Sequence, residues 1–233
     1  MTTINFLKDN EIELFDSPPR FTEEARNRFL VLPDNEVKFR KTETKIGYIL
    51  QEGYFMSKKK FFLPEHFHTE DVKFVRKLLG IKNRVAISKD YNKITYSIHK
   101  KFILNKNGYH SFSDSKDIFE KEASELVKTS LRPREIFESL LDFLEEKRIE
   151  VPRYYVFAEV ITQSLNLFEN NLIGIIDRTL YGSNMTDEQL LDKYKVVVRE
   201  LTDNRQSLRR AALLGGCSLG TAQKIRKIIE KRT

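Results

Sequence analysis

Apolar residues recur at helical spacing along most of this chain, and start and stop signals separate the runs. Thr22 precedes a run that halts at Pro33, where the pyrrolidine ring opposes a continuing helix. A second apolar stripe, between Ile46 and Tyr54, keeps the three-and-four spacing that places its members on one helix face. The pattern therefore predicts a helix at each place.

The next run begins at Thr69, which we expect to cap a helix, and Gly80 stands where a left-handed stop is usual. The inner face of this predicted helix holds Val72, Val75, Leu78 and Leu79.

Farther on, Ile94, Ile98 and Phe102 follow one another at intervals of four. This spacing puts them on one face, so the pattern predicts that they point into the core. Asn107 with Gly108 predicts the end of that helix.

The second half of the chain continues in the same way. Pro133 and Pro152 each suit a first helical position ahead of an apolar stripe. Thr186 and Gln189 have the spacing of a capping box. The best strand candidate is the short stretch 84–87, so we predict a mainly α-helical fold.

Composition is that of a folded protein, because 40% of the 233 residues are hydrophobic and only 9 are Gly and 6 Pro. No apolar run approaches the roughly 20 residues of a membrane-spanning helix, and the first residues lack the pattern of a secretory signal. The single cysteine, Cys217, excludes an internal disulfide framework and a cysteine-rich zinc module. We expect a cytoplasmic, nucleoid-associated protein without a membrane contact.

The formal charge of +7 is unevenly distributed. Residues 56–106 hold 13 Lys and Arg against 4 Asp and Glu, and residues 192–233 hold 11 against 4. Between them, residues 107–191 hold 9 Lys and Arg against 16 Asp and Glu, and we call this segment the acidic block. Two basic blocks on one chain indicate contact with a polyanion, most often nucleic acid.

The second basic block has the features of a helix-turn-helix over residues 207–229. Ala212 is small enough for a helix crossing, Gly216 suits the tight turn, and Ala222 with Ile225 would face inward. Cys217 is interpreted as a small buried hydrophobe rather than a nucleophile.

We expect Ser218 to cap the second helix of this motif. Gln can pair with adenine edges, Lys with guanine acceptors, and Arg with phosphates. The predicted DNA-binding residues of the tail are Arg209, Arg210, Ser218, Gly220, Thr221, Gln223, Lys224, Arg226 and Lys227. An amphipathic hairpin with a solvated basic face is the alternative interpretation. At these residues, roughly the last 40 of the chain, the tail resembles the carboxyl-terminal helix-turn-helix of serine resolvases and invertases, but no upstream segment resembles their catalytic serine domain.

A longer resemblance rests on several separated segments that occur in order. They are DSPPRFTEEARNRF (16–29), IGYILQEGYFMSKKKFF (46–62), FHTEDVKFV (67–75), YNKITYSIHK (91–100), GYHSF (108–112), LRPREI (131–136) and IEVPRYYVFAE (149–159). Over roughly residues 5–175 the series resembles the amino-terminal DNA-binding region of the large transposases of replicative, cointegrate-forming bacterial transposons, the Tn-three type.

In that family this region recognises the terminal inverted repeats, so the resemblance implies sequence-specific duplex binding. The residue types fit, because lysines can neutralise phosphates and hydroxyl groups can bond their oxygens. The expected contacts are Lys58, Lys59, Lys60, Lys93, Thr95, Tyr96, His99 and Lys100. For each of them the alternative is a solvated charged helix. The metal-binding acidic triad of those longer transposases has no counterpart here.

We therefore expect a multi-helical transposase-like DNA-binding region over residues 1–180, a linker near 181–184, and a helix-turn-helix domain over 187–233. The expected function is binding of duplex DNA at transposon-end-like sites, as a regulator or accessory factor that is not an enzyme and needs no cofactor or metal. A transposase or recombinase and a second copy of the chain are further expected partners. Two alternatives stay open: a component of a transposase or recombinase whose catalytic residues come from a partner, and a protein-interaction module that uses the acidic block.

Overall fold

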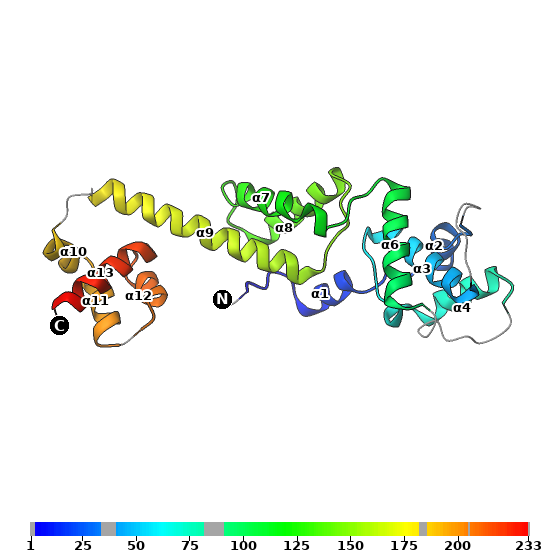
Figure 1. The fold of residues 1–233 in the computed structure, drawn as a ribbon, viewed down its shortest axis with the longest axis horizontal. Helices are drawn as coiled ribbons and strands as arrows, with labels where there is room; N and C mark the ends of the chain where they lie inside the picture. Colours follow the sequence, from blue (N-terminus) through cyan, green and yellow to red (C-terminus); the bar gives the residue numbers. More distant parts are fainter. Residues whose placement is uncertain (1–2, 34–40, 82–90, 182–185, 205, 233) are drawn as a thin grey trace. The chain divides into compact units, whose positions relative to one another are not determined.

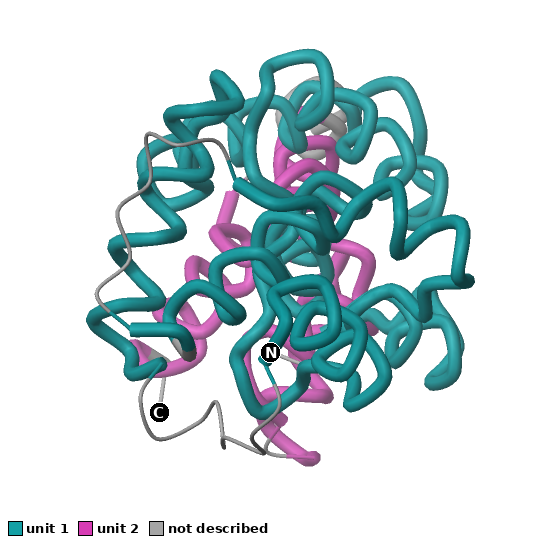
Figure 2. The backbone as a smooth tube through the Cα atoms, turned by 90° about the vertical axis from the view of Figure 1, so that its right-hand side faces the viewer, with its two compact units in different colours: residues 1–162 teal, residues 163–233 magenta. Residues whose placement is uncertain are grey.

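In the computed structural model of this chain, residues 3–33, 41–81, 91–181, 186–204 and 206–232 are described. Twelve α-helices and no β-strand occur in these ranges, which confirms the mainly α-helical fold. The chain divides into two compact units, residues 1–162 and 163–233 (Figure 2). The division falls within a long helix, earlier than the expected linker. The stretch 84–87 and all but the first residue of that linker lie outside the described residues.

The helices of the first unit are α1 (Asp9–Asp16), α2 (Glu23–Phe29), α3 (Thr42–Lys58), α4 (Thr69–Leu78), α6 (Lys93–Asn107), α7 (Lys116–Leu126), α8 (Pro133–Glu146) and the first part of α9 (Tyr154–Tyr181) (Figure 1). Single 3₁₀ turns lie at Pro64–His66 and Ser113–Ser115. The helices of the second unit are the rest of α9, α10 (Asp187–Lys193), α11 (Lys195–Thr202), α12 (Leu208–Leu214) and α13 (Leu219–Arg232).

Helix α3 is the centre of the amino-terminal bundle and contacts α2, α4 and α6. The stripe from Ile46 to Tyr54 is buried along it, as predicted. Helix α2 begins as predicted too, since the hydroxyl oxygen of Thr22 accepts a 3.2 Å hydrogen bond from the amide of Ala25. Gly80 ends the following segment with φ of 68°.

Two details of α4 differ from the prediction. His68 occupies the N-cap position, and Thr69 is the first helical residue. Leu78, expected inside, is 40% exposed, because the contact with the core is made by buried Val75 and half-buried Val72 and Leu79.

A buried carboxylate joins three helices of this bundle. Asp71 of α4 is fully buried, and it accepts a hydrogen bond of 2.6 Å from Nε of Arg26 and one of 2.8 Å from the hydroxyl of Tyr54. Burial first, and then the neighbouring Asp71 carboxylate, raise the pKa of Tyr54 well above its usual value, so the tyrosine remains a proton donor. The two bonds satisfy a charge that would be costly to bury alone.

Aromatic rings dominate the packing of α7, α8 and the start of α9. The Phe157 ring lies 4.9 Å from Phe137 and 5.3 Å from Phe119, measured between ring centroids, in edge-to-face geometry. Pro133 opens α8 as predicted, and Ile136 and Leu140 are buried.

The amino-terminal segment is tied to the start of α9 from a great distance in sequence. The amide of Phe6 donates a 3.0 Å hydrogen bond to the hydroxyl of Tyr154, and the amide of Tyr154 donates to the carboxylate of Asp16. The amide of Ile4 donates to the Thr162 hydroxyl over a separation of 158 residues. We call these contacts the terminal clasp.

Pro152 is not a first helical residue, because α9 begins only at Tyr154. The preceding residues are extended and paired: the amide of Glu150 donates to the carbonyl of His110, and the amide of Val151 to that of Lys59. These pairings keep the chain out of helical conformation until they end.

The second unit has its own core at the tail. Leu190, Tyr194, Val197 and residues of α12 and α13 form one buried cluster. Thr186 and Gln189 form the predicted capping box at the start of α10.

Candidate nucleic-acid interface

The tail contains a helix, a glycine turn and a second helix at the predicted positions. Ala211 and Ala212 of α12 are buried, and Gly216 has φ of 62°, a left-handed conformation that favours glycine. Gly215 packs so closely that a Cβ atom there would lie 2.1 Å from Cγ2 of Val197. Cys217 is 2% exposed, as the interpretation of a small buried hydrophobe requires.

Helix α13 begins with the predicted serine cap. The Ser218 hydroxyl oxygen accepts a 3.1 Å hydrogen bond from the amide of Thr221 and lies 2.9 Å from the Thr221 hydroxyl. Ala222, Ile225 and Ile228 are buried beneath the helix. Its solvent side therefore presents Gly220, Gln223, Lys224, Arg226 and Lys227.

Besides Ser218, two of the predicted contacts in the tail are partly engaged within the chain. Thr221 is only half-exposed, and its side chain is held by Ser218. Arg226 donates from Nε to Glu230 at 2.8 Å, but this pair is exposed on both sides, so water and salt screen it strongly.

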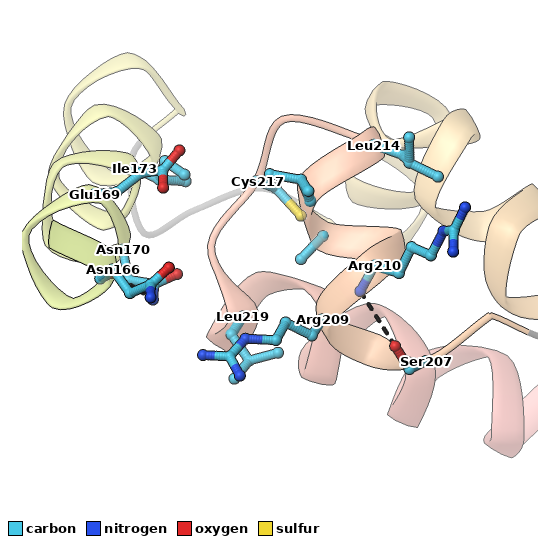
Figure 3. Close-up of a pocket in the computed structure, with 12 residues that line it drawn as sticks. Asn166, Glu169, Asn170, Ile173, Ser207, Arg209, Arg210, Leu214, Cys217 and Leu219 are labelled. Carbon is cyan, nitrogen blue, oxygen red and sulfur yellow. Dashed lines mark hydrogen bonds between the residues drawn. The ribbon is translucent and has the colours of Figure 1, made fainter. Parts of the chain in front are cut away.

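Arg209 and Arg210 are exposed on α12 and leave the helix in different directions (Figure 3). Both line a cavity of about 520 Å³ within the second unit, together with Asn166 and Asn170 of α9. Ser207 caps α12, accepting a 3.3 Å hydrogen bond from the amide of Arg210.

The three consecutive lysines at the end of α3 are not an open phosphate-contacting run. Lys58 donates from Nζ to the carbonyls of Leu14 and Ser17, and half-buried Lys59 donates to the carbonyl of Met56. Burial lowers the pKa of both lysines.

Lys60 was wrongly predicted to contact phosphate. Its side chain is 4% exposed, and Nζ lies 2.6 Å from the carboxylate of Asp16 and 3.6 Å from the ring centre of Phe15. Burial lowers the pKa of Lys60 to about 8, against the opposing effect of Asp16. Its ammonium group faces the protein, so we remove it from the interface.

Helix α6 is rotated relative to the prediction. Ile94, Ile98 and Phe102, expected in the core, are 72%, 61% and 38% exposed. Ile103 and Leu104 are buried instead, and half-buried Tyr96, His99 and Lys100 lie on the inner side. Lys93 is exposed, whereas Thr95 is half-buried and its amide donates to the cap residue Asn92.

The inward polar groups of α6 are occupied. Nδ1 of His99 lies 2.9 Å from the hydroxyl of Tyr91, and burial lowers the pKa of His99 to about 4. Burial, followed by the charge of Glu150, raises the pKa of Tyr96 to about 12. Lys100 forms an ion pair with Glu150. These groups hold the helix in place; because all three side chains are only half-buried, their DNA contacts stay predictions.

A comparison with known protein families identifies the family to which the first unit corresponds. A family model described as a domain of unknown function, DUF4158, matches residues 6–164, which is more than half of the chain. The chain belongs to the DUF4158 family. No curated protein and no solved structure matches it.

The DUF4158 match ends two residues beyond the first unit and includes α1 to the beginning of α9. Helices α10 to α13 lie outside it. The family description assigns no function, so the roles of both basic regions are argued from their residues.

Sequence reasoning missed one exposed lysine and misplaced an exposed apolar row within the DUF4158 region. Lys101 is exposed beside Ile98, and it was not among the predicted contacts. A usable signal existed: the 15 residues of α6 include four lysines and no Asp or Glu.

No group of three or more His, Cys, Asp or Glu residues suited to a metal ion occurs within the described ranges. Among the helices described, none combines the length and the hydropathy needed to cross a membrane.

Proposed function

We propose that this protein binds double-stranded DNA sequence-specifically, at transposon-end-like or related sites. In this proposal it is a cytoplasmic, nucleoid-associated regulator or accessory factor of mobile-element origin and has no catalytic centre of its own. A transposase or recombinase acting at the same DNA is the expected partner.

One observation supports the proposal most: the solvent face of α13. Gln223, Lys224 and Lys227 project from a helix that is fixed from below by Ala222 and Ile225. A helix of this kind fits the major groove, where amide and ammonium groups can bond base edges. Arg209 and Arg210, exposed on the preceding helix, are suited to phosphate contacts.

The test begins with selection from random duplexes by the full chain. We expect one recovered motif, with affinity that falls linearly on a logarithmic salt scale. If the chain binds no duplex at low salt, the proposal is wrong. Cleavage of the selected duplex by the purified chain alone with Mg²⁺ would instead make it an enzyme.

Three variants then distinguish residues that contact base edges from residues that contact phosphates. Gln223→Ala should relax preference at one base position, whereas Arg209→Ala should weaken all sequences alike and reduce the salt slope by about one. Lys128→Gln is the matched charge control, because this exposed lysine lies in the acidic block and pairs with Glu125. It should leave affinity unchanged.

A further inference from the structure

The solvent face of α6 consists of two parallel rows of side chains. One row is apolar: Ile94, Ile98 and Phe102. The second row is polar and exposed, and its residues come one position earlier in the sequence: Lys93, Ser97, Lys101 and Asn105. Residues four apart lie on the same helix face, so each row runs nearly along the axis.

This face is firmly supported from behind. Ile103 is fully buried and Leu104 nearly so, and the Phe102 ring contacts Tyr48 of α3 at 6.1 Å between centroids. The cap at Asn92 and the left-handed Gly108 fix the two ends of the helix. The apolar row is therefore a fixed feature of the surface rather than a frayed segment.

The charge of α6 is entirely positive. Lys100 and Lys106 turn toward Glu150 and Glu52, but Lys93 and Lys101 have no ion-pair partner in the described part of the chain. An apolar row beside cations, without any carboxylate on the helix, is complementary to a polyanion that also offers apolar groups. A second copy of the same face is a poor occupant, because it would bring lysine-bearing helices together.

Duplex DNA has this combination of groups. In the major groove the thymine methyl is the apolar group on a base edge, and phosphates line both sides. The groove is about 12 Å wide and a helix with its side chains is about 10–12 Å across. Four residues of helix rise about 6 Å, close to two base-pair steps, so Ile94 and Ile98 can reach bases two apart.

We infer that the exposed face of α6 lies in the major groove of duplex DNA, with Ile94 and Ile98 against thymine methyl groups and Lys93 and Lys101 at phosphates. The inference rests on the proposed duplex binding and adds a second reading helix, within the DUF4158 region and independent of α13. It assigns the recognition of bases to the apolar row, which the sequence pattern had placed in the core.

The experiment replaces single thymines of the selected duplex by deoxyuridine, which removes only the C5 methyl group. The full chain should lose affinity at one or two positions, by about four-fold for each buried methyl. The Ile98→Ala variant should bind thymine and uracil equally at one of these positions. Gln223→Ala should keep the discrimination there, since Gln223 is on the other reading helix.

Leu131→Ala is the matched control, because Leu131 is an apolar residue 63% exposed in the acidic block. It should preserve both affinity and discrimination. Circular dichroism of each variant verifies the fold, which truncation of an exposed side chain leaves intact.

The outcomes distinguish the two proposals. If the chain binds its selected duplex but no thymine-to-uracil change matters, or if Ile98→Ala keeps the discrimination, the role of α6 is wrong and duplex binding stands. If Ile98→Ala instead changes the molar mass by light scattering, the face is a protein contact and the inference is overturned. Absence of duplex binding by the full chain overturns both.

Discussion

Nδ1 of His99 lies 2.9 Å from the hydroxyl oxygen of Tyr91, eight residues earlier in the chain. The Tyr91 hydroxyl donates to Gln51 at 2.5 Å, so its one proton is used there. We infer that Nδ1 carries the histidine hydrogen and that the neutral imidazole donates to Tyr91. The inner side of α6 is therefore anchored by a neutral histidine.

This anchor predicts an acid-sensitive first unit. The pKa of His99 is lowered to about 4 in the folded state, against about 6.5 when unfolded, so the unfolded chain binds the extra proton first. Stability due to His99 is complete above pH 6.5 and is lost as the pH falls toward 4. Because the ring is only part-buried, we expect a loss of about 1 kcal/mol.

Urea titrations at pH 7 and pH 4.5 measure this loss. The His99→Gln variant should lose less stability between these two pH values than the native chain. Equal losses in both proteins would show that other groups cause the acid sensitivity.

Removing the charge of Asp71 should strongly destabilise the amino-terminal bundle. Asp71→Asn leaves the guanidinium of Arg26 without its buried partner and weakens the bond from Tyr54, so we expect a cost of about 3 kcal/mol. Glu70→Gln alters the exposed neighbour and should cost less than about 0.5 kcal/mol. Similar costs for both in urea unfolding would contradict the role given to the buried network.

Lys60 predicts an increase in stability at alkaline pH. Its folded pKa of about 8 is below the unfolded value of 10.5, so between these values the unfolded chain holds more protons and stability rises with pH. The rise is at most about 3 kcal/mol. Unfolding free energies at pH 7.5 and 9.5 measure it, and Lys60→Met should abolish it; parallel curves for the two proteins would refute the assignment.

The glycines of the tail should differ sharply in tolerance. Gly215→Ala places a methyl group against Val197 and should destabilise the second unit by about 1–3 kcal/mol. Gly220→Ala meets no atom nearer than 3.8 Å and should be neutral or slightly stabilising in a helix.

Thermal unfolding of these variants gives the comparison. Adding Val197→Ala to Gly215→Ala should recover part of the loss, because the clash is with that side chain. If the double variant is simply the sum of the two single ones, the close approach is not the cause.

The tail was predictable from sequence because its determinants are local. The cap at Ser218, the turn at Gly216 and the inner residues Ala222 and Ile225 lie within ten residues of one another. Each acts through backbone geometry or short-range packing, so no distant contact was needed to interpret them.

The orientation of α6 was not predictable by the same reasoning. The regular spacing of Ile94, Ile98 and Phe102 indicated an inner face, but Tyr96, His99 and Ile103 form the competing face at three-and-four spacing. Hydropathy counts Tyr and His as polar, whereas their rings bury large apolar areas once partners such as Tyr91 and Gln51 satisfy their polar tips. Gln51 comes from α3 and Tyr91 precedes α6 by two residues, so the α6 pattern alone could not include them.

The buried ion pairs were not predictable either, because their partners are far apart in the sequence. Asp71 and Arg26 are 45 residues apart, and Lys60 and Asp16 are 44 apart. A run of lysines indicates a solvated surface when it is considered alone. Only the fold brings Asp16 and the ring of Phe15 over Lys60 and converts one member of the run into a core residue.

The terminal clasp sets an order of events during protein synthesis. Phe6 and Asp16 leave the ribosome early, but their partner Tyr154 follows them by 148 and 138 residues. The bundle of α2, α3, α4 and α6 can form on the nascent chain, with the end of α1 already held by Lys58 and Lys60, whereas the contacts of Phe6 and Asp16 with Tyr154 must wait until α9 emerges. Completion of the first unit is therefore coupled to translation of its last helix.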